Sequence, residues 1–179
     1  MNLLEQHQRA VLALIKSRAT DCAGDPWITR VSGSRELEMV RGIALWWRQY
    51  QIEAQCLYTT RALKGAGRFE QTVSGFFDGR ATSPFIEELG RAFLGALRAD
   101  ADPVVRAVAM FESACHAVRE GSLETFRIEW DRDPTQVLRA LETRTRLPKP
   151  GRGCVMLLGK QVPGLIALEP RVFPSVAVA

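Results

Sequence analysis

Two short apolar runs near the C-terminal end constrain the fold of this chain more than any other feature. They are Cys154–Leu158 and Leu165–Leu168, and Val162, Pro163 and Gly164 form the turn between them. An isolated two-stranded hairpin is only marginally stable in water. The two runs therefore need a further strand, a helix or another chain to pack against.

A third strand is predicted between two helical patterns. In Thr125–Trp130, the residues Phe126, Ile128 and Trp130 alternate with polar ones. A period of two is typical of a half-buried strand. The resulting order, helix, helix, strand, helix, strand, turn, strand, predicts a winged-helix-like module. In such a module the third strand lies between the first and the second, so Cys154–Leu158 would be an edge strand.

Most of the remaining chain carries apolar residues at helical spacing. The stretch Asp21–Ser34 is rich in turn-forming residues and is interpreted as a loop, with Ser34 as the N-cap of the next helix. Three later helix starts place a capping side chain before a proline, which suits the first helical position. They are Ser83-Pro84, Asp102-Pro103 and Asp133-Pro134.

These patterns predict a mainly α fold with a small β-sheet, that is, the α+β class. The domain boundary that we favour lies between Ala99 and Asp102. Residues 1–100 would form a helical bundle, and residues 101–179 would form the winged-helix-like domain with its three-stranded sheet. With 179 residues, the chain is long enough for one compact core or for two small units.

Composition excludes several classes of protein. No stretch reaches the run of about 18 apolar residues that a membrane helix needs. Glu5 and His7 lie where a signal peptide would be basic and then purely apolar, so we expect a cytoplasmic protein without a membrane partner. The cysteines form no CxxC pair and lie in or beside apolar patterns, which favours buried free thiols. They are Cys22, Cys56, Cys115 and Cys154.

The sequence offers little catalytic chemistry. Its two histidines, His7 and His116, have no second histidine four residues away and no other spacing typical of a metal site. No glycine-rich phosphate loop or GxSxG nucleophile motif is present. Glu87 and Glu88 form an exposed helix face rather than an acid–base pair. We therefore expect no independent enzyme and no metal or cofactor in this chain.

One local basic patch stands out against a formal net charge of only +4. No acidic residue lies between Glu142 and Glu169. Such a patch suits nucleic acid, an acidic peptide or an acidic partner surface, and the alternative is a solvated basic loop. The basic residues are Arg144, Arg146, Lys149, Arg152 and Lys160.

Three aromatic residues, Trp46, Trp47 and Tyr50, crowd one predicted helix. Trp47 and Tyr50 lie on its apolar stripe, whereas Trp46 lies beside it. The cluster predicts either a wide buried face in a helical core or an interface with another protein, where Trp and Tyr are enriched. The stripe consists of Val40, Ile43, Trp47, Tyr50, Ala54 and Leu57.

A set of motifs resembles one bacterial family. In Arg68–Leu97, a phenylalanine-bearing helix precedes a Ser-Pro start, then Leu-Gly, two residues, and Phe-Leu. The motifs MFESACHAV and RIEWDRDPTQVLRAL and the Pro-Gly hairpin follow in the family's order. The family is often labelled DNA-binding, and the resemblance is strongest to the methanobactin biosynthesis partner proteins. The matching positions in the first motif are Phe69, Phe77, Ser83, Pro84, Leu89, Gly90, Phe93 and Leu94.

What the resemblance implies is a non-catalytic partner subunit. Members of this family form a heterodimer with an iron-containing TIM-barrel oxidase and present it with a ribosomally made precursor peptide. The oxidase uses dioxygen to convert a cysteine of the peptide into an oxazolone with a neighbouring thioamide, which later binds copper. The resemblance thus places the iron in the partner oxidase, and residues 101–179 would be the peptide-recognition domain.

The expected edge strand, Cys154–Leu158, suggests how such a chain would bind the leader peptide. An extended leader peptide would add itself as a fourth strand, satisfying free backbone groups and placing alternate side chains in pockets. The aromatic residues Trp46, Trp47 and Tyr50 would contact the oxidase. An alternative is that residues 171–179 cover the same edge. The predicted peptide-binding residues are Cys154, Val155, Met156, Leu157 and Leu158, with Arg144, Arg146, Arg152 and Lys160 for acidic leader residues.

A different class of function, a winged-helix DNA-binding regulator, remains the alternative. Its recognition helix would be Asp133–Thr143, lying in the major groove. That helix offers few residues able to read bases besides Gln136 and Arg139. A net charge of +4 is also low for a surface that follows the phosphate backbone, so nucleic acid is not the expected partner.

Overall fold

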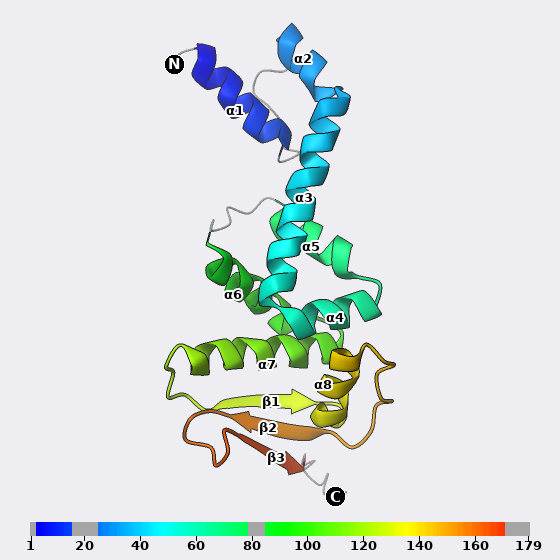
Figure 1. Ribbon diagram of the computed structural model, residues 1–179, viewed down its shortest axis with the longest axis vertical. Coiled ribbons are helices and arrows are strands. Elements are labelled where there is room, and N and C mark those ends of the chain that lie inside the picture. Colours follow the sequence, from blue (N-terminus) through cyan, green and yellow to red (C-terminus); the bar gives the residue numbers. More distant parts are fainter. Residues whose placement is uncertain (1–2, 16–24, 79–84, 171–179) are drawn as a thin grey trace, which may run out of the picture. The chain divides into compact units, whose positions relative to one another are not determined.

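The computed structural model describes residues 3–15, 25–78 and 85–170 (Figure 1). Helices dominate these residues and accompany a small antiparallel sheet, which confirms the predicted α+β class. The elements in chain order are α1 (Leu3–Ile15), α2 (Pro26–Ser32), α3 (Arg35–Gln55), α4 (Leu57–Gly65), α5 (Phe69–Phe77), α6 (Ile86–Ala96), the 3₁₀ turn η1 (Leu97–Ala99), α7 (Pro103–Arg119), β1 (Phe126–Trp130), α8 (Pro134–Thr143), β2 (Cys154–Leu158) and β3 (Ile166–Pro170).

The described residues divide into two compact units. The first comprises those within 1–51 and 70–82, and the second comprises those within 52–69 and 83–179. The boundary predicted between Ala99 and Asp102 therefore falls inside the second unit. The physical reason is that α7, which follows this boundary, packs against α4 and α6, which precede it.

In the first unit, α1 and α2 pack against the beginning of α3. Ala10, Leu14, Ile28 and Leu37 form the buried cluster that joins these three helices. Arg41 Nε adds a hydrogen bond to the carbonyl oxygen of Leu14 at 2.8 Å. Packing of this kind orders helices that are too short to be stable alone.

The stretch predicted as a loop, Asp21–Ser34, instead contains α2, so that interpretation was wrong. Asp25 is the N-cap of α2, and its carboxylate accepts hydrogen bonds from the amides of Trp27 and Ile28. Pro26 follows at the first helical position. The Asp-Pro start that marks two later helices is thus also present here, within residues that otherwise favour turns.

Three of the predicted helix caps are confirmed. Ser34 Oγ accepts a hydrogen bond from the amide of Leu37 at 3.1 Å, which confirms Ser34 as the cap of α3. Asp102 and Asp133 cap α7 and α8 in the predicted way. The start predicted at Ser83-Pro84 was wrong: α6 begins at Ile86, and its N-cap residue, Phe85, makes no side-chain hydrogen bond. Ser83 and Pro84 themselves lie outside the described residues.

The core of the second unit lies around α7, which contacts α4, α6 and β1. Phe93 and Val108 are completely buried there, and Trp130 of β1 is 1% exposed. Gly90 lets α6 approach the junction between α3 and α4, because a Cβ atom at this position would lie 2.8 Å from the Cβ of Gln55.

The sheet order is β1-β2-β3, with both pairs antiparallel. The winged-helix order, with the third strand in the centre, was therefore wrong. β2 contains only apolar residues and takes the position paired on both sides, where its side chains are best buried. β3 ends in Glu169 and Pro170, and both residue types suit an edge strand.

Candidate functional site

The predicted peptide-binding strand is the central strand of the sheet. Each residue of Cys154–Leu158 has a partner in β1 and another in β3. Val155, Met156 and Leu158 are buried, while Cys154 and Leu157 are half-buried. A strand paired on both sides has no free backbone groups for another chain. The assignment of the leader-binding edge to this strand was therefore wrong.

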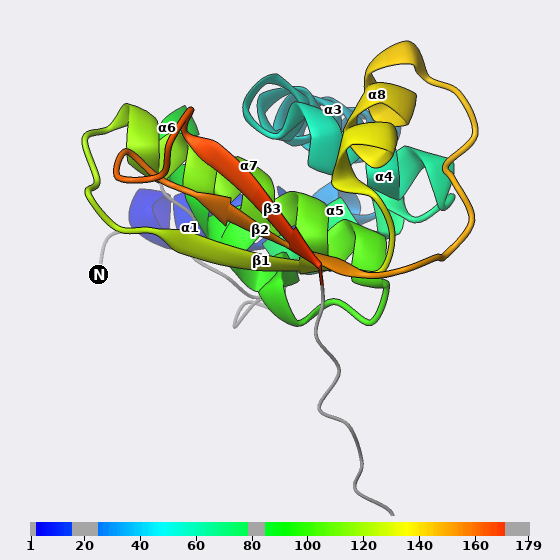
Figure 2. The same ribbon diagram turned by 90° about the horizontal axis from the view of Figure 1, so that it is seen from below.

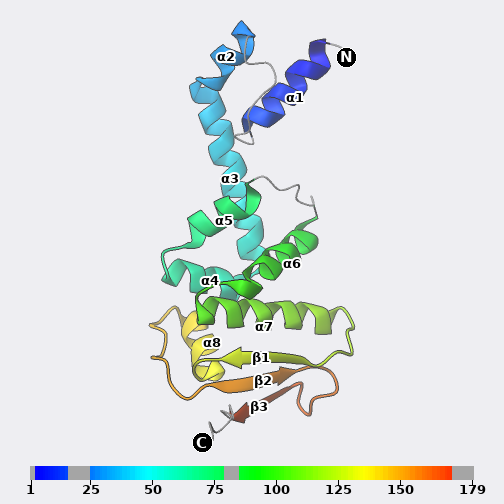
Figure 3. The same cartoon turned by 180° about the vertical axis from the view of Figure 1, so that it is seen from behind.

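The exposed apolar edge belongs to β3 instead. Figures 1 and 3 show β3 at the edge of the sheet that lies away from α7. Its side chains Ile166 and Leu168 are 45% and 48% exposed. The opposite edge strand, β1, carries exposed charged residues, Arg127 and Glu129. Of the two edges, β3 is thus the one that is chemically suited to pairing with another apolar segment.

Leu165, immediately before β3, combines two unfavourable features. Its backbone has a φ of 69°, in the left-handed region, and its large apolar side chain is exposed. Such a backbone conformation costs a residue with a Cβ atom about 1–2 kcal/mol. The backbone of Leu165 closes the hairpin turn, because its amide donates to the carbonyl oxygen of Val162 at 2.8 Å and its carbonyl oxygen accepts from the amide of Gly159 at 3.1 Å. Its side chain remains exposed to solvent.

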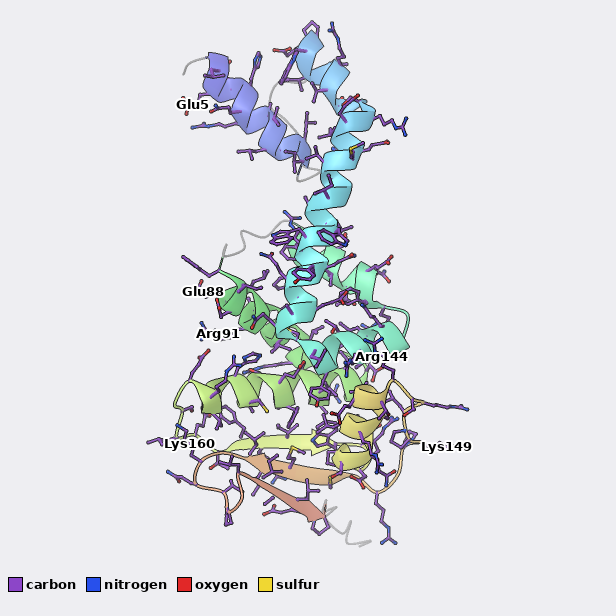
Figure 4. All side chains as sticks on the ribbon, in the orientation of Figure 1. Glu5, Glu88, Arg91, Arg144, Lys149 and Lys160 are labelled. Atoms are coloured by element: carbon purple, nitrogen blue, oxygen red, sulfur yellow. The ribbon has the colours of Figure 1, made fainter. Side chains whose placement is uncertain are left out.

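The predicted basic residues do not form one cluster. Arg144 and Lys149 lie at one end of the sheet and Lys160 lies at the other, in the turn between β2 and β3 (Figure 4). Arg152 is exposed in the segment before β2. Arg144 and Arg146 are the two that share a cavity. The basic patch seen in the sequence is therefore distributed over both ends of the second unit.

That cavity, which we call the α4–α8 groove, has a volume of about 570 Å³. Figure 2 shows α8 beside α4, with residues 144–153 running from the end of α8 to β2. A volume of this size lies within the range typical of ligand sites. One wall of the groove includes Leu57, Arg61 and Lys64 of α4, and the other includes Leu141, Arg144, Arg146 and Leu147.

The cations of the groove have different surroundings. Arg61 donates hydrogen bonds of 3.2 Å to the carbonyl oxygens of Leu141 and Glu142, at the C-terminus of α8. Lys64 pairs with Glu53 at 2.7 Å. Within the described part of the chain, Arg144 and Arg146 form no ion pair. These two exposed arginines are thus the groove's free positive charges.

The α4 wall of the groove was missed in the sequence. Leu57, Arg61 and Lys64 are spaced four and three residues apart, which places them on one helix face. This spacing was a usable signal for one face of a helix. The pairing of this face with the end of α8 depends on residues far apart in the sequence.

Trp46, Trp47 and Tyr50 form an exposed aromatic cluster on α3. Trp46 is 60% exposed, and more than half of the surface of the other two is also exposed. The ring of Tyr50 stacks on Trp46 and on Trp47, with centroids 5.9 Å and 5.6 Å apart. The prediction of a wide buried face at these residues was wrong.

The cluster continues along α3 as an exposed apolar surface, which we call the α3 stripe. In the first unit, the beginning of α3 packs at Leu37, and further along the guanidinium of Arg48 lies over the ring of Phe77, 4.7 Å from its centroid. One face of the helix between these contacts remains exposed. A contiguous apolar patch of this kind marks an interaction site in many proteins. The α3 stripe consists of Met39, Val40, Ile43, Trp46, Trp47 and Tyr50.

The cysteines and histidines have structural surroundings. Cys56, Cys115 and Cys154 are free thiols, and Cys22 lies outside the described residues. Burial raises the pKa of Cys115 to about 11 and raises the pKa of Cys154. His116 Nε2 lies 3.1 Å from the carbonyl oxygen of Gln55. Among the described residues, no group of three or more histidine, cysteine or acidic side chains is arranged to hold a metal ion.

The helices of the described ranges include none with the length and apolar character required to cross a membrane. Comparison of the sequence with protein-family models and with curated proteins, and of the structure with solved structures, finds no match.

Proposed function

We propose that this chain is a non-catalytic, cytoplasmic partner subunit that binds the leader of a ribosomally made precursor peptide. It would present a cysteine of that peptide to an iron-dependent TIM-barrel oxidase, with the iron held by the oxidase. The reaction would form an oxazolone and a thioamide, as in the biosynthesis of methanobactin-type copper chelators. The motif order between Arg68 and Leu141 supports this assignment.

The observation that carries the proposal is the apolar edge of β3, which pairs with no further strand among the described residues. The alternative cover, residues 171–179, lies outside the described residues. A peptide that pairs with an edge strand gains main-chain hydrogen bonds, and its alternate side chains gain specific contacts. Ile166 and Leu168 offer apolar surface to such side chains. The leader would thus form a fourth strand, beside β3 rather than beside Cys154–Leu158.

The α3 stripe supports a second part of the proposal, the docking of the oxidase. Large interface residues that dominate binding are most often Trp, Tyr and Arg. Trp46, Trp47 and Tyr50 provide three neighbouring rings on one helix, with Tyr50 stacked on both tryptophans. Their exposure in the isolated chain is consistent with burial against a larger partner.

We do not propose the DNA-binding alternative. The exposed surface of α8 and its cap carries Asp133 and Glu142 beside Arg139. Gln136 donates a hydrogen bond to the carboxylate of Asp133 at 3.2 Å, which uses one of its two amide donors. Carboxylates at this position would be repelled by DNA phosphates.

The proposal is tested with the genes that neighbour this one. We expect an oxidase gene and a gene for a short cysteine-containing peptide, and we expect the tagged chain to co-purify with the iron-loaded oxidase. A synthetic leader segment of that peptide should bind the full chain in calorimetric titration. If the oxidase is absent from the purified complex and the leader does not bind, the proposed function is wrong.

Two proline variants, Ala167→Pro and Leu168→Pro, locate the bound strand. Successive amides of a strand point in opposite directions, so one variant removes a hydrogen bond to β2 and the other blocks the free edge. The edge-blocking variant should keep its melting temperature and lose leader affinity. If it retains both, the leader does not pair with β3.

A further inference from the structure

The α4–α8 groove combines an aliphatic interior with two free arginines, and the proposed edge-strand site does not use it. We propose that this groove is a second peptide site, which holds an acidic segment with an aliphatic anchor residue. The inference rests on the proposed function for the source of the peptide, which would be an acidic part of the same precursor. The support for a binding site in the groove comes from the residues that line it and does not depend on the proposed function.

The charge of the groove selects an anion. Lys64 and Glu53 neutralise one another, and Arg61 is directed to the negative end of the α8 dipole through the carbonyl oxygens of Leu141 and Glu142. Arg144 and Arg146 remain without an ion pair among the described residues. Arginine binds carboxylates through two parallel hydrogen bonds, so each of the two arginines is suited to one acidic side chain.

The interior of the groove selects an apolar anchor. Leu57 is 45% exposed, and Leu147 is half-buried on the opposite wall. Leu141, which is buried, belongs to the same wall as Leu147 and lies at the end of α8. A leucine or isoleucine side chain placed there would remove aliphatic surface from water on several sides, which favours binding.

A peptide fits this groove better than a nucleic acid. None of the described residues that line the groove is aromatic, whereas proteins that bind single strands stack the bases on aromatic rings. Phosphate contacts alone would leave Leu57 and Leu147 exposed. An acidic amphipathic peptide satisfies the arginines and the leucines together.

The backbone conformation of Arg144 allows its charge to be removed without destabilising the fold. Arg144 has a φ of 55° and caps α8 in the left-handed conformation. Glycine is the residue that this position normally favours. Arg144→Gly therefore removes the charge while it keeps or raises the stability of the fold, so a loss of binding in this variant does not arise from unfolding.

The experiment uses the full chain and a short fluorescent peptide of alternating glutamates and leucines, measured by anisotropy. Arg144→Gly and the double variant Arg144→Glu/Arg146→Glu remove or reverse the charge. Arg35→Glu/Arg127→Glu is the matched control, since both arginines are exposed and lie outside the groove. Leu57→Gln tests the aliphatic wall, and a lysine–leucine peptide tests the sign of the charge.

We expect the double reversal to weaken binding of the acidic peptide by about tenfold or more at low salt. Leu57→Gln should also weaken binding of the acidic peptide, and the control variant should bind it as the unchanged chain does. Added salt should reduce the difference in affinity between the unchanged chain and the double charge-reversal variant. Equal losses in the groove and control variants would overturn the inference. Binding of a single-stranded oligonucleotide in preference to the acidic peptide would also overturn it.

The leader segment separates this inference from the proposed function. If groove variants bind both the probe and the leader normally while the edge-blocking proline variant loses the leader, the groove inference fails and the proposed function stands. If the leader binds no form of the chain, but binding of the glutamate–leucine peptide still depends on Arg144 and Arg146, the proposed function is wrong and the groove site is supported.

Discussion

At the scale of single residues, Arg68 and Asp100 join the turn after α4 to the segment before α7. Arg68 Nη1 and Nη2 each donate to one carboxylate oxygen of Asp100, at 2.9 Å. The carboxylate also accepts a hydrogen bond from the amide of Asp102. The Arg68 guanidinium is the main reason that the pKa of Asp100 lies below its ordinary value. A buried carboxylate with these partners is a stabilising group when it is ionised.

We expect Asp100→Asn to lower the free energy of unfolding by about 1–3 kcal/mol near neutral pH. Because the folded pKa is depressed, this contribution is complete above the ordinary carboxyl pKa of about 4 and is lost as the pH falls through the folded value. The two proteins should therefore converge in stability in acid. Urea unfolding at several pH values measures the difference, and a difference that stays constant into acid would contradict the assignment.

The exposed pair between Arg91 and Glu120 provides the control for this experiment. Its atoms are 2.6 Å apart, but both side chains are accessible to solvent. Exposed ion pairs contribute about 0–1 kcal/mol. Glu120→Gln should therefore have a small effect at every pH.

At the scale of elements, α7 supplies the cap that α4 lacks. Cys56 is the N-cap residue of α4 and makes no side-chain hydrogen bond there. The carboxylate of Glu112 on α7 instead accepts from the amides of Tyr58 and Thr59, both at 2.8 Å. Burial raises the pKa of Glu112, although these hydrogen bonds oppose the change. The two helices are thus joined through the free amides of a helix start.

Removing this cap should destabilise the second unit. Glu112→Ala leaves two amides without acceptors in a buried place, and we expect a loss of about 2–4 kcal/mol in the free energy of unfolding. Glu112→Gln retains one acceptor oxygen and should lose less. Denaturant unfolding monitored by circular dichroism measures both values. An alanine variant as stable as the unchanged chain would show that water replaces the carboxylate at no cost.

At the scale of the whole molecule, each of the two units exposes an apolar surface. The first unit presents the α3 stripe, and the second presents the edge strand β3 with Leu165 before it. Folded monomers seldom expose contiguous apolar surface of this kind without a binding role. Both surfaces belong to elements with regular backbone structure, so each can be altered at its side chains without disturbing the fold.

The double variant Ile43→Lys/Trp46→Lys tests the α3 stripe. Both side chains are about 60% exposed, so the melting temperature should change little. Binding of a hydrophobic dye and self-association should fall, and so should recovery of the neighbouring oxidase. Ile52→Lys, at a fully buried position of the same helix, should strongly destabilise the chain. If the two variants destabilise the chain equally, the stripe belongs to the core.

Local chemistry determined where several of the elements begin. Asp102-Pro103 and Asp133-Pro134 mark α7 and α8 because capping and the fixed φ of proline act between adjacent residues. The bounds predicted for the strand Cys154–Leu158 are those observed. The sequence alone also determined the α+β class, since a period of two and a helical period are both visible in a single chain.

Only the tertiary structure decided which surfaces are available for binding. The central place of β2 depends on how well its side chains are buried between two neighbours, and a pattern along one strand does not contain that information. The exposure of Trp46 depends on which helices pack against α3, and a buried stripe and an interface stripe have the same spacing. The α4–α8 groove brings Leu57 and Arg146 together from distant parts of the sequence, so it exists only once the helices are packed.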